Sequence, residues 1–350
     1  MHISTICFIA TTLSLTTFTT NARINLTDDI SLSGFGSTSI TQSNNATPLY
    51  VNREITDDIC YDCDTTLGLQ GDIRFNDSFN ASIQVVKRPQ DDWSSPELEW
   101  AYVGYSVSDF NLKLGRLRLP LFLSSEYYYV GQAYTSARPP QEVYNSILGF
   151  TAYEGISGTW DIEINDESYL TLTPYAGVES DGSVDIGVIS YDFVIDNTLG
   201  LHSEISGFDY RIMFNYAHFK YAVDVTTPLG SQHYAADSIH IYTLGIEKSW
   251  EQLTLTTEVL IDKMHFNWYS SIGYNIDKFT PYVTYAESHH TKKNNSLLLG
   301  LRYELTTTVS LNAEWKYTDA NGGSNGELIT APTDDETDAQ LYTLMLNFIF

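Results

Sequence analysis

Cysteine, basic residues and long apolar runs are all scarce in this chain of 350 residues. Lys and Arg together number 18, against 44 Asp and Glu, which leaves a net charge of −26. So acidic a chain is not expected to bind nucleic acid, because such binding requires neutralisation of phosphate charge. No apolar run reaches the roughly 18 residues of a membrane-spanning helix, so no such helix is expected.

The chain has 3 cysteines, and Cys7 lies in the apolar N-terminal stretch. The other two, Cys60 and Cys63, form a CxxC motif. A redox-active motif of this kind is typical of a βαβ pattern, which does not surround it here. A zinc site would need two further ligands nearby, and none is present, so we expect neither a metal site nor a cofactor. In an oxidising compartment, we expect Cys60 and Cys63 to form a disulfide within a small loop.

The first 22 residues differ from the rest of the chain. Residues 3–18 are apolar or hydroxylic without a charge, and Thr20, Asn21 and Ala22 form an acceptable small-residue cleavage site. His2 is the only potential cation before them. An N-terminal membrane anchor is the alternative, but it needs a longer apolar run. We therefore expect residues 1–22 to be a secretory signal peptide and residues 23–350 to be the mature protein.

Aromatic residues are abundant, with 25 Tyr, 16 Phe and 6 Trp. Past the N-terminal stretch, apolar and polar residues alternate with a period of two, which is typical of half-buried strands. Tight turns such as residues 76–78 alternate with longer polar loops. Aromatic excess without helical spans is expected of the interfacial girdles of a membrane barrel, which also has short turns on one side and long loops on the other.

We expect about 16 strands, an even number that places both chain ends on one side of a closed barrel. They lie near residues 30–40, 67–75, 79–85, 97–102, 110–119, 149–164, 169–179, 198–207, 209–224, 238–250, 253–265, 267–276, 279–289, 296–306, 308–320 and 339–350. A β-solenoid would show a fixed short repeat, which is absent. A β-sandwich array would expose fewer aromatics. The expected fold is therefore all-β, a transmembrane antiparallel β-barrel, in which every backbone group is paired as lipid requires.

The stretch from Phe110 to Phe150 interrupts this rhythm. Its strand alternates to Gly115, where a bulge is expected, and then resumes so that Arg116 and Arg118 share the face opposite Leu117. After Pro120 the alternation is absent for roughly thirty residues, far longer than an ordinary connection. The segment holds too many tyrosines and apolar residues for disorder. We expect this loop, which follows the fifth strand, to fold into the barrel lumen.

The pattern as a whole resembles the outer-membrane porins of Gram-negative bacteria. The N-terminal stretch, the alternating strands and the final strand ending in Phe350 carry the likeness. Residues 97–119 and 137–144 look like a recurrent block of gammaproteobacterial porin-like proteins. In general porins the loop after the fifth strand narrows the pore, although the acidic PEFGG-like tip of that loop is absent here.

The resemblance has implications for location, partners and activity. It implies a location in the outer membrane, contact with outer-membrane lipids, and recognition of Phe350 by the outer-membrane assembly machinery. It also implies a homotrimer and a water-filled channel for passive diffusion of small hydrophilic solutes and ions. A barrel enzyme such as a lipase, and a surface adhesin or receptor built on the long loops, are the alternative functions. The chain has no GxSxG elbow, which disfavours a lipase without excluding one.

Charged residues near the long loop are candidates for the pore constriction. Seven of the 18 cations fall between positions 74 and 138. Opposed charges across a narrow wet gap create a transverse field that orients dipolar solutes. Alternatively, the cations pair with neighbouring acids and stiffen the wall. The candidate constriction residues are Arg74, Lys113, Arg116, Arg118 and Arg138, set against Glu97, Glu99, Glu126 and Glu142.

Overall fold

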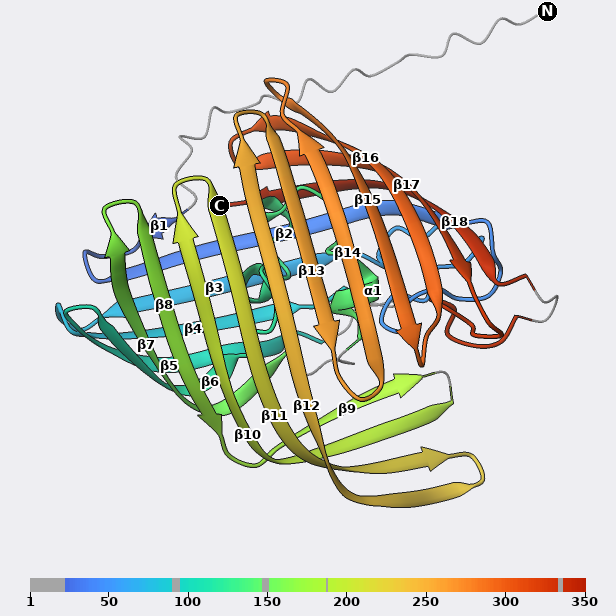
Figure 1. Ribbon diagram of the computed structural model, residues 1–350, viewed down its shortest axis with the longest axis horizontal. Coiled ribbons are helices and arrows are strands. Elements are labelled where there is room, and N and C mark those ends of the chain that lie inside the picture. Colours follow the sequence, from blue (N-terminus) through green and yellow to red (C-terminus); the bar gives the residue numbers. More distant parts are fainter. Residues whose placement is uncertain (1–22, 90–94, 147–150, 187, 333–335) are drawn as a thin grey trace, which may run out of the picture.

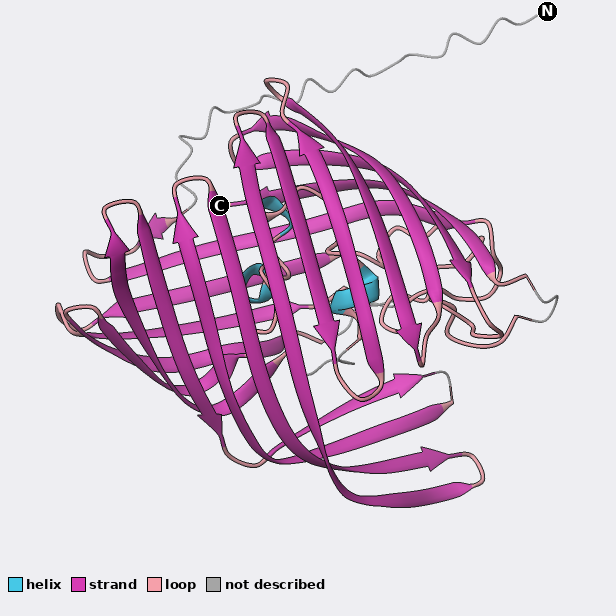
Figure 2. Cartoon of the chain, in the orientation of Figure 1, coloured by secondary structure: helices cyan, strands magenta, loops and turns pink. Residues whose placement is uncertain are grey.

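The computed structural model describes residues 23–350 except 90–94, 147–150, 187 and 333–335. The expected signal peptide, residues 1–22, lies outside this range. Strands dominate the described chain, and helix is confined to three short turns (Figure 2). None of the helices in the described part is long and apolar enough to cross a membrane.

The described elements follow one another along the chain as strands joined mostly by hairpins. They are β1 (Ile24–Asn25), β2 (Ile30–Ser43), β3 (Thr66–Arg74), β4 (Phe79–Lys87), β5 (Glu97–Val107), β6 (Phe110–Arg118), η1 (Ser125–Tyr127), η2 (Gly131–Ala133), α1 (Gln141–Tyr144), β7 (Ala152–Asn165), β8 (Ser168–Gly177), β9 (Ser180–Ile186), β10 (Ile189–Gly207), β11 (Tyr210–Thr227), β12 (Gly230–Trp250), β13 (Leu253–Ile261), β14 (His265–Tyr274), β15 (Phe279–His290), β16 (Asn294–Thr306), β17 (Val309–Ala320) and β18 (Asp338–Ile349).

Sixteen of the described strands, β2–β8 and β10–β18, form a closed antiparallel barrel. Each pairs with its neighbours in the chain, β18 pairs with β2, and β8 pairs with β10. The two-residue strand β1 lies beside β2, and β9 pairs only with the first part of β10. Closure leaves no free sheet edge in the wall, as lipid requires. The expected 16-strand barrel is confirmed.

The two ends of the barrel differ. Turns of two to four residues join the strands at one end, where β2 begins and β18 ends. The long connections β2–β3, β4–β5, β6–β7 and β17–β18 all lie at the other end, together with short turns such as β13–β14 and β15–β16. Strands β10, β11 and β12 have 19, 18 and 21 residues, although roughly 9–11 suffice to cross a bilayer. We expected strands near 198–207 and 238–250, so the sequence pattern missed about nine residues at the start of β10 and eight at the start of β12.

The excess length forms a flap, which we define as residues 180–186, 188–195 and 221–237. Register shifts between Ile195 and Asn197 and between Tyr221 and Val223 mark its base, and bulges of this kind bend a ribbon. The flap bends across the long-loop end of the barrel (Figure 1). Its side chains Val184 and Phe193 pack against Val51 of the β2–β3 connection.

The wall is apolar outside and polar inside. Leu299 on the outer face of β16 is 48% exposed, whereas Asn312 and Glu314 on the inner face of β17 are 0% and 8% exposed. A protein surrounded by water has the opposite arrangement. Lipid around the outer face and polar groups within explain this inversion.

Candidate pore constriction

The connection between β6 and β7 carries η1, η2 and α1 and is the longest connection in the barrel (Figures 1 and 2). Its Leu121, Phe122 and Val143 are buried with the inward-facing Phe219 and Ile241 of β11 and β12. Further contacts reach the inner faces of β13–β18. We call residues 119–146 the crossing segment, because these contacts begin at β6 and extend to strands on the far side of the wall.

Arg138 attaches the crossing segment to the β2–β3 connection. Its Nε donates to Asp64 Oδ1 at 2.6 Å, and its Nη2 donates to Asp64 Oδ2. Its Nη1 and Nη2 also donate to the hydroxyls of Thr343 and Thr41, each at 3.0 Å. Arg53 donates a further bond to Asp64 Oδ1 at 2.8 Å. One carboxylate is thereby held between two guanidinium groups.

This cluster is almost fully enclosed, with Asp64 only 2% exposed. Burial alone would raise the pKa of Asp64, but Arg138 and Arg53 lower that pKa well below its usual value of 3.8. Burial would likewise lower the pKa of Arg138, yet the Asp64 carboxylate raises it instead. The pair therefore stays ionised at neutral pH, and its geometry is that of a bidentate charge-assisted contact.

Glu99 of β5 fixes the start of the crossing segment through Arg118 of the neighbouring strand β6. Its Oε1 accepts a bond from Arg88 Nε at 2.6 Å, and its Oε2 pairs with Arg118. Arg118 Nε donates in turn to the carbonyl of Ser125 in η1. The Arg118 guanidinium also lies 4.9 Å from the ring centroid of Tyr129. Glu99 is completely buried, so its two cations compensate a charge that water cannot reach.

Glu142 of α1 provides a third attachment. Its Oε1 accepts bonds from Lys316 Nζ at 2.7 Å and from Ser296 Oγ at 2.6 Å. The side-chain amide of Asn267 donates to the Glu142 carbonyl at 2.8 Å. Lys316 also lies 5.4 Å from the ring centroid of Tyr50. A single turn of helix is too short to be stable alone, so these wall contacts hold it in place.

Glu258 of β13 is an attachment that the sequence did not single out. Its carboxylate accepts bonds from the Leu123 backbone N–H at 2.6 Å and from the Tyr144 and Tyr269 hydroxyls at 2.7 Å and 2.6 Å. In the sequence, Glu258 is visible as an acidic residue that follows Thr257 and precedes the apolar end of a predicted strand. Many inward positions of a barrel carry polar residues, so that signal alone could not identify it.

Arg302 and Glu314 were also missed as site residues. Arg302 Nη1 donates to the carbonyls of Gly131 at 3.2 Å and Tyr134 at 2.6 Å. Glu314 Oε1 accepts a bond from the Ala137 backbone N–H at 2.7 Å. Arg302 of β16 and Glu314 of β17 thus supply hydrogen-bond partners to backbone groups of the crossing segment, which is irregular and has few backbone hydrogen bonds of its own.

The predicted constriction residues do not all meet. The structure brings Glu99, Arg118, Arg138 and Glu142 into the attachments of the crossing segment, and Glu97 joins them through Arg88 at 2.8 Å. These charges are held in ion pairs, as in the alternative of a stiffened wall. The structure shows no continuous basic ladder among them.

Two predicted cations lie elsewhere. Arg74 is at the short-turn rim, where it pairs with Asp29 at 3.3 Å and is 60% exposed, so it belongs to no constriction cluster. Arg116 pairs with Glu154 at 2.7 Å. The prediction of a bulge at Gly115 is wrong, because β6 pairs with β5 and β7 through this residue without a register shift.

Unbroken alternation therefore places Arg116 on the opposite face from Leu117. Leu117 is buried inside with the crossing segment, so Arg116 lies opposite Leu117 as expected, but on the outer face. The side chain of Arg118 instead reaches inward to Glu99, and the two arginines form no basic ladder in the lumen. Lys113 lies inside, 5.0 Å from the ring centroid of Tyr102. Glu126 is exposed and lines the same cavity as Lys113.

Cavities lie on both sides of the crossing segment. At the short-turn side, cavities of about 610 Å³ and 320 Å³ share Leu123, Tyr127 and Arg211 in their linings. A third cavity of about 240 Å³ lies toward the long loops and shares no lining residue with those two. The crossing segment contributes side chains to all three and separates the third from the others.

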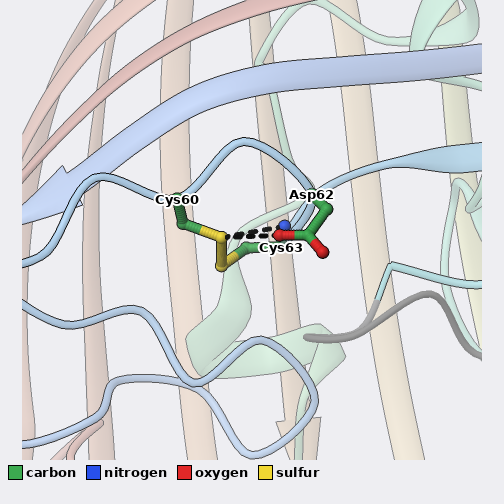
Figure 3. A group of neighbouring side chains, drawn as sticks. All are labelled: Cys60, Asp62 and Cys63. Atoms are coloured by element: carbon green, nitrogen blue, oxygen red, sulfur yellow. Dashed lines mark hydrogen bonds between the residues drawn. A yellow bond between two sulfur atoms is a disulfide. The ribbon is translucent and has the colours of Figure 1, made fainter.

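Cys60 and Cys63 are joined by a disulfide in the β2–β3 connection (Figure 3). Asp62 lies beside it, with Oδ1 3.3 Å from Cys60 Sγ. Disulfide sulfurs are not the thiolates that zinc requires, so this oxidised group is no metal site. The disulfide directly precedes Asp64, the residue that holds Arg138.

No family model and no curated protein matches the chain. Solved structures do match its fold. An anion-selective porin from Comamonas acidovorans has a TM-score of 0.60 at 12% identity, over 92% of this chain and 99% of that one. OmpF of Salmonella typhi has a TM-score of 0.61 at 10% identity, over 94% and 100%.

OmpT, an outer-membrane protein of Vibrio cholerae, has a TM-score of 0.58 at 12% identity, over 93% of this chain and 99% of that one. Structural similarity at sequence identities this low establishes the fold, and it leaves the substrate and the activity open. With its closed ring of 16 strands, polar inside and apolar outside, the chain is a porin-like β-barrel of the outer-membrane type.

Proposed function

We propose that the protein is a channel of the Gram-negative outer membrane, through which small hydrophilic solutes and ions diffuse passively. The observation that carries this proposal is the polar interior of a closed barrel that is apolar outside. Such an interior lets water and solutes enter while the outer face stays in lipid. Concentration gradients drive the flux, so no cofactor or energy source is required.

The crossing segment is the constriction in this proposal. It separates cavities at the two ends of the barrel, and buried ion pairs hold its Arg138 to Asp64 of the β2–β3 connection and its Glu142 to Lys316 of β17. Because these charges are paired and buried, they present a weaker net field to the passage than a free ladder would. The expected channel is therefore narrow, with its width set by how firmly these pairs hold the segment.

Planar-bilayer recording of the refolded mature protein, residues 23–350, tests the channel. We expect discrete conductance steps, with a reversal potential in a salt gradient that reports ion preference. A variant in which residues 124–146 are replaced by a short Gly-Ser linker should conduct more in each step, because the constriction is removed. Absence of steps from both proteins would refute the channel, and equal conductance would refute the constriction.

The surroundings of the barrel belong to the same proposal. Residues 1–22 act as the export signal, and the exposed C-terminal Phe350 is the contact for the outer-membrane assembly machinery. Phe350 is joined to β2 by backbone bonds with Gly34 at 2.8 Å and 2.9 Å. We expect Phe350→Ala to reduce the amount of folded barrel in outer membranes while the refolded protein still conducts in bilayers.

A homotrimer is the proposed assembly. The Arg116–Glu154 pair lies on the outward side of the wall, where charged groups cost free energy in contact with lipid. A neighbouring protomer would cover such a pair. Native mass spectrometry of the detergent-solubilised protein should show three chains, and a monomer at all concentrations would contradict this assembly.

The proposal assigns the protein no reaction of its own. Hydrolysis of phospholipid by the purified protein in mixed micelles would instead support a barrel enzyme. We expect no hydrolysis above a detergent blank under conditions in which the same preparation forms channels.

A further inference from the structure

The cavity of about 240 Å³ on the long-loop side of the crossing segment has an unusual wall for a barrel interior. Four inward positions of neighbouring strands are apolar there: Phe193 and Ile195 of β10, Phe219 of β11 and Ile241 of β12. Each is at most 9% exposed. Leu121 of the crossing segment covers one edge of this wall, and the cavity remains beside it. Pockets for organic molecules are typically lined in this way.

Polar residues also line this cavity, and three of them are acidic. Glu142, Asp262 and Glu327 line it, and the basic side chains in the same lining are Lys292 and His265. Two of the acids are already engaged, because Glu142 pairs with Lys316 at 2.7 Å and Asp262 Oδ2 lies 2.9 Å from His265 Nδ1.

Glu327 differs from the other two acids. It is 4% exposed, yet its Oε2 has no hydrogen-bond partner within the described chain. A buried carboxylate oxygen without a partner costs free energy until a donor reaches it. A ligand that supplies this donor would recover that cost.

We propose that this cavity binds a small amphipathic amine, with its apolar body against Phe219 and Ile241 and its ammonium group on Glu327. An ammonium matches the spare carboxylate oxygen and the acidic surroundings, and it donates the missing hydrogen bond. The proposal rests on the proposed channel, since it places a solute-binding site on the long-loop side of the constriction. It names the class of solute that the channel would retain before passage.

Isothermal titration calorimetry of the mature protein in detergent micelles tests the site, with 2-phenylethylamine as the probe. Titration into empty micelles corrects for partitioning of the probe into detergent. We expect saturable binding of 2-phenylethylamine, and weaker binding of 2-phenylethanol, which lacks the charge, and of ethanolamine, which lacks the apolar body. Equal binding of 2-phenylethylamine and 2-phenylethanol would overturn the ammonium contact.

Two variants and a matched control locate the site. Glu327→Gln should weaken 2-phenylethylamine binding about tenfold or more and change 2-phenylethanol binding less than about threefold, because only the charged contact is lost. Ile241→Ser should weaken both. Glu204→Gln removes a carboxylate from the separate cavity of about 610 Å³ and should leave binding unchanged. If Glu327→Gln binds like the wild type, the assignment is wrong.

The bilayer recording separates this proposal from the channel. Steps of conductance without saturable amine binding would refute the site and leave the channel intact. Saturable binding that depends on Glu327, in a protein that forms no conductance steps, would support the site and refute the channel.

Discussion

At the scale of residues, the buried acids Asp64 and Glu99 are surrounded by opposite charges and hydrogen-bond donors. Asp64 lies between two arginines, and Glu99 between two others. Removing one partner of such a group leaves a buried charge uncompensated, which costs far more than losing an exposed pair. The attachments of the crossing segment should therefore be sensitive to single substitutions.

Arg138→Met tests this sensitivity. The variant should lower the free energy of unfolding by about 3 kcal/mol, because the buried Asp64 carboxylate loses its bidentate cation and keeps the single bond from Arg53. The matched control is Arg74→Met, which breaks the exposed pair with Asp29 and should cost less than about 1 kcal/mol. Thermal unfolding in detergent, followed by near-ultraviolet circular dichroism, measures both. Similar losses for the two variants would contradict the role of Arg138.

The cluster of Arg53, Asp64 and Arg138 also predicts that the stability of the protein depends on pH. The pKa of Asp64 is lower in the folded protein than its usual value of 3.8. Its contribution to stability is therefore complete above pH 3.8 and is lost as the pH falls toward the folded-state pKa. The difference in unfolding free energy between wild type and Asp64→Asn should be large at about pH 7 and smaller at about pH 2.5. A difference that stays constant over this range would show that Asp64 does not titrate as the cluster requires.

At the scale of elements, the crossing segment is an irregular chain whose order comes from the wall. Its helical turns have 3, 3 and 4 residues, too few to be stable in isolation. Side chains of β13, β16 and β17 bond its backbone at Leu123, Tyr134 and Ala137. The path of the crossing segment thus depends on elements far away in the sequence.

The β2–β3 connection is one such element, and its disulfide should affect the segment through Asp64. Replacing both Cys60 and Cys63 by Ser removes a closed loop of a few residues, which should lower the unfolding free energy by about 2 kcal/mol. Because Asp64 follows directly, open-channel current noise should rise as the hold on Arg138 loosens. Reduction of the wild type should reproduce this noise. Unchanged noise in both would separate the disulfide from the constriction.

At the scale of the whole molecule, the exposed outer face predicts how the barrel responds to lipid. Leu299 lies within β16 and Leu305 near its short-turn end, and both are exposed. In a bilayer, Leu299→Arg should cost about 2–4 kcal/mol, whereas Leu305→Arg should cost less than about 1 kcal/mol near the interface. Unfolding by guanidinium from lipid vesicles, followed by tryptophan fluorescence, measures both. Near-neutral effects at both positions would indicate an outer face in water.

The alternation of residues by itself determined the class of fold, the number of barrel strands and the long connection after the fifth. A period of two assigns side chains to faces wherever pairing is regular, as it does for Leu299 and Glu314. The pattern could not reveal the excess length of β10 and β12, since polar residues such as Ser190 and Gln232 are as common in loops as in strands. It also placed a bulge at Gly115 that the paired strands do not contain.

Only the tertiary structure decided which charges meet. Asp64 and Arg138 are 74 residues apart, and Glu142 and Lys316 are 174 apart. Closure of the barrel brings these residues together, because strands distant in the chain face one interior. Whether a polar inward residue such as Glu258 contacts the crossing segment depends on the path of that segment, and local periodicity carries no information about that path.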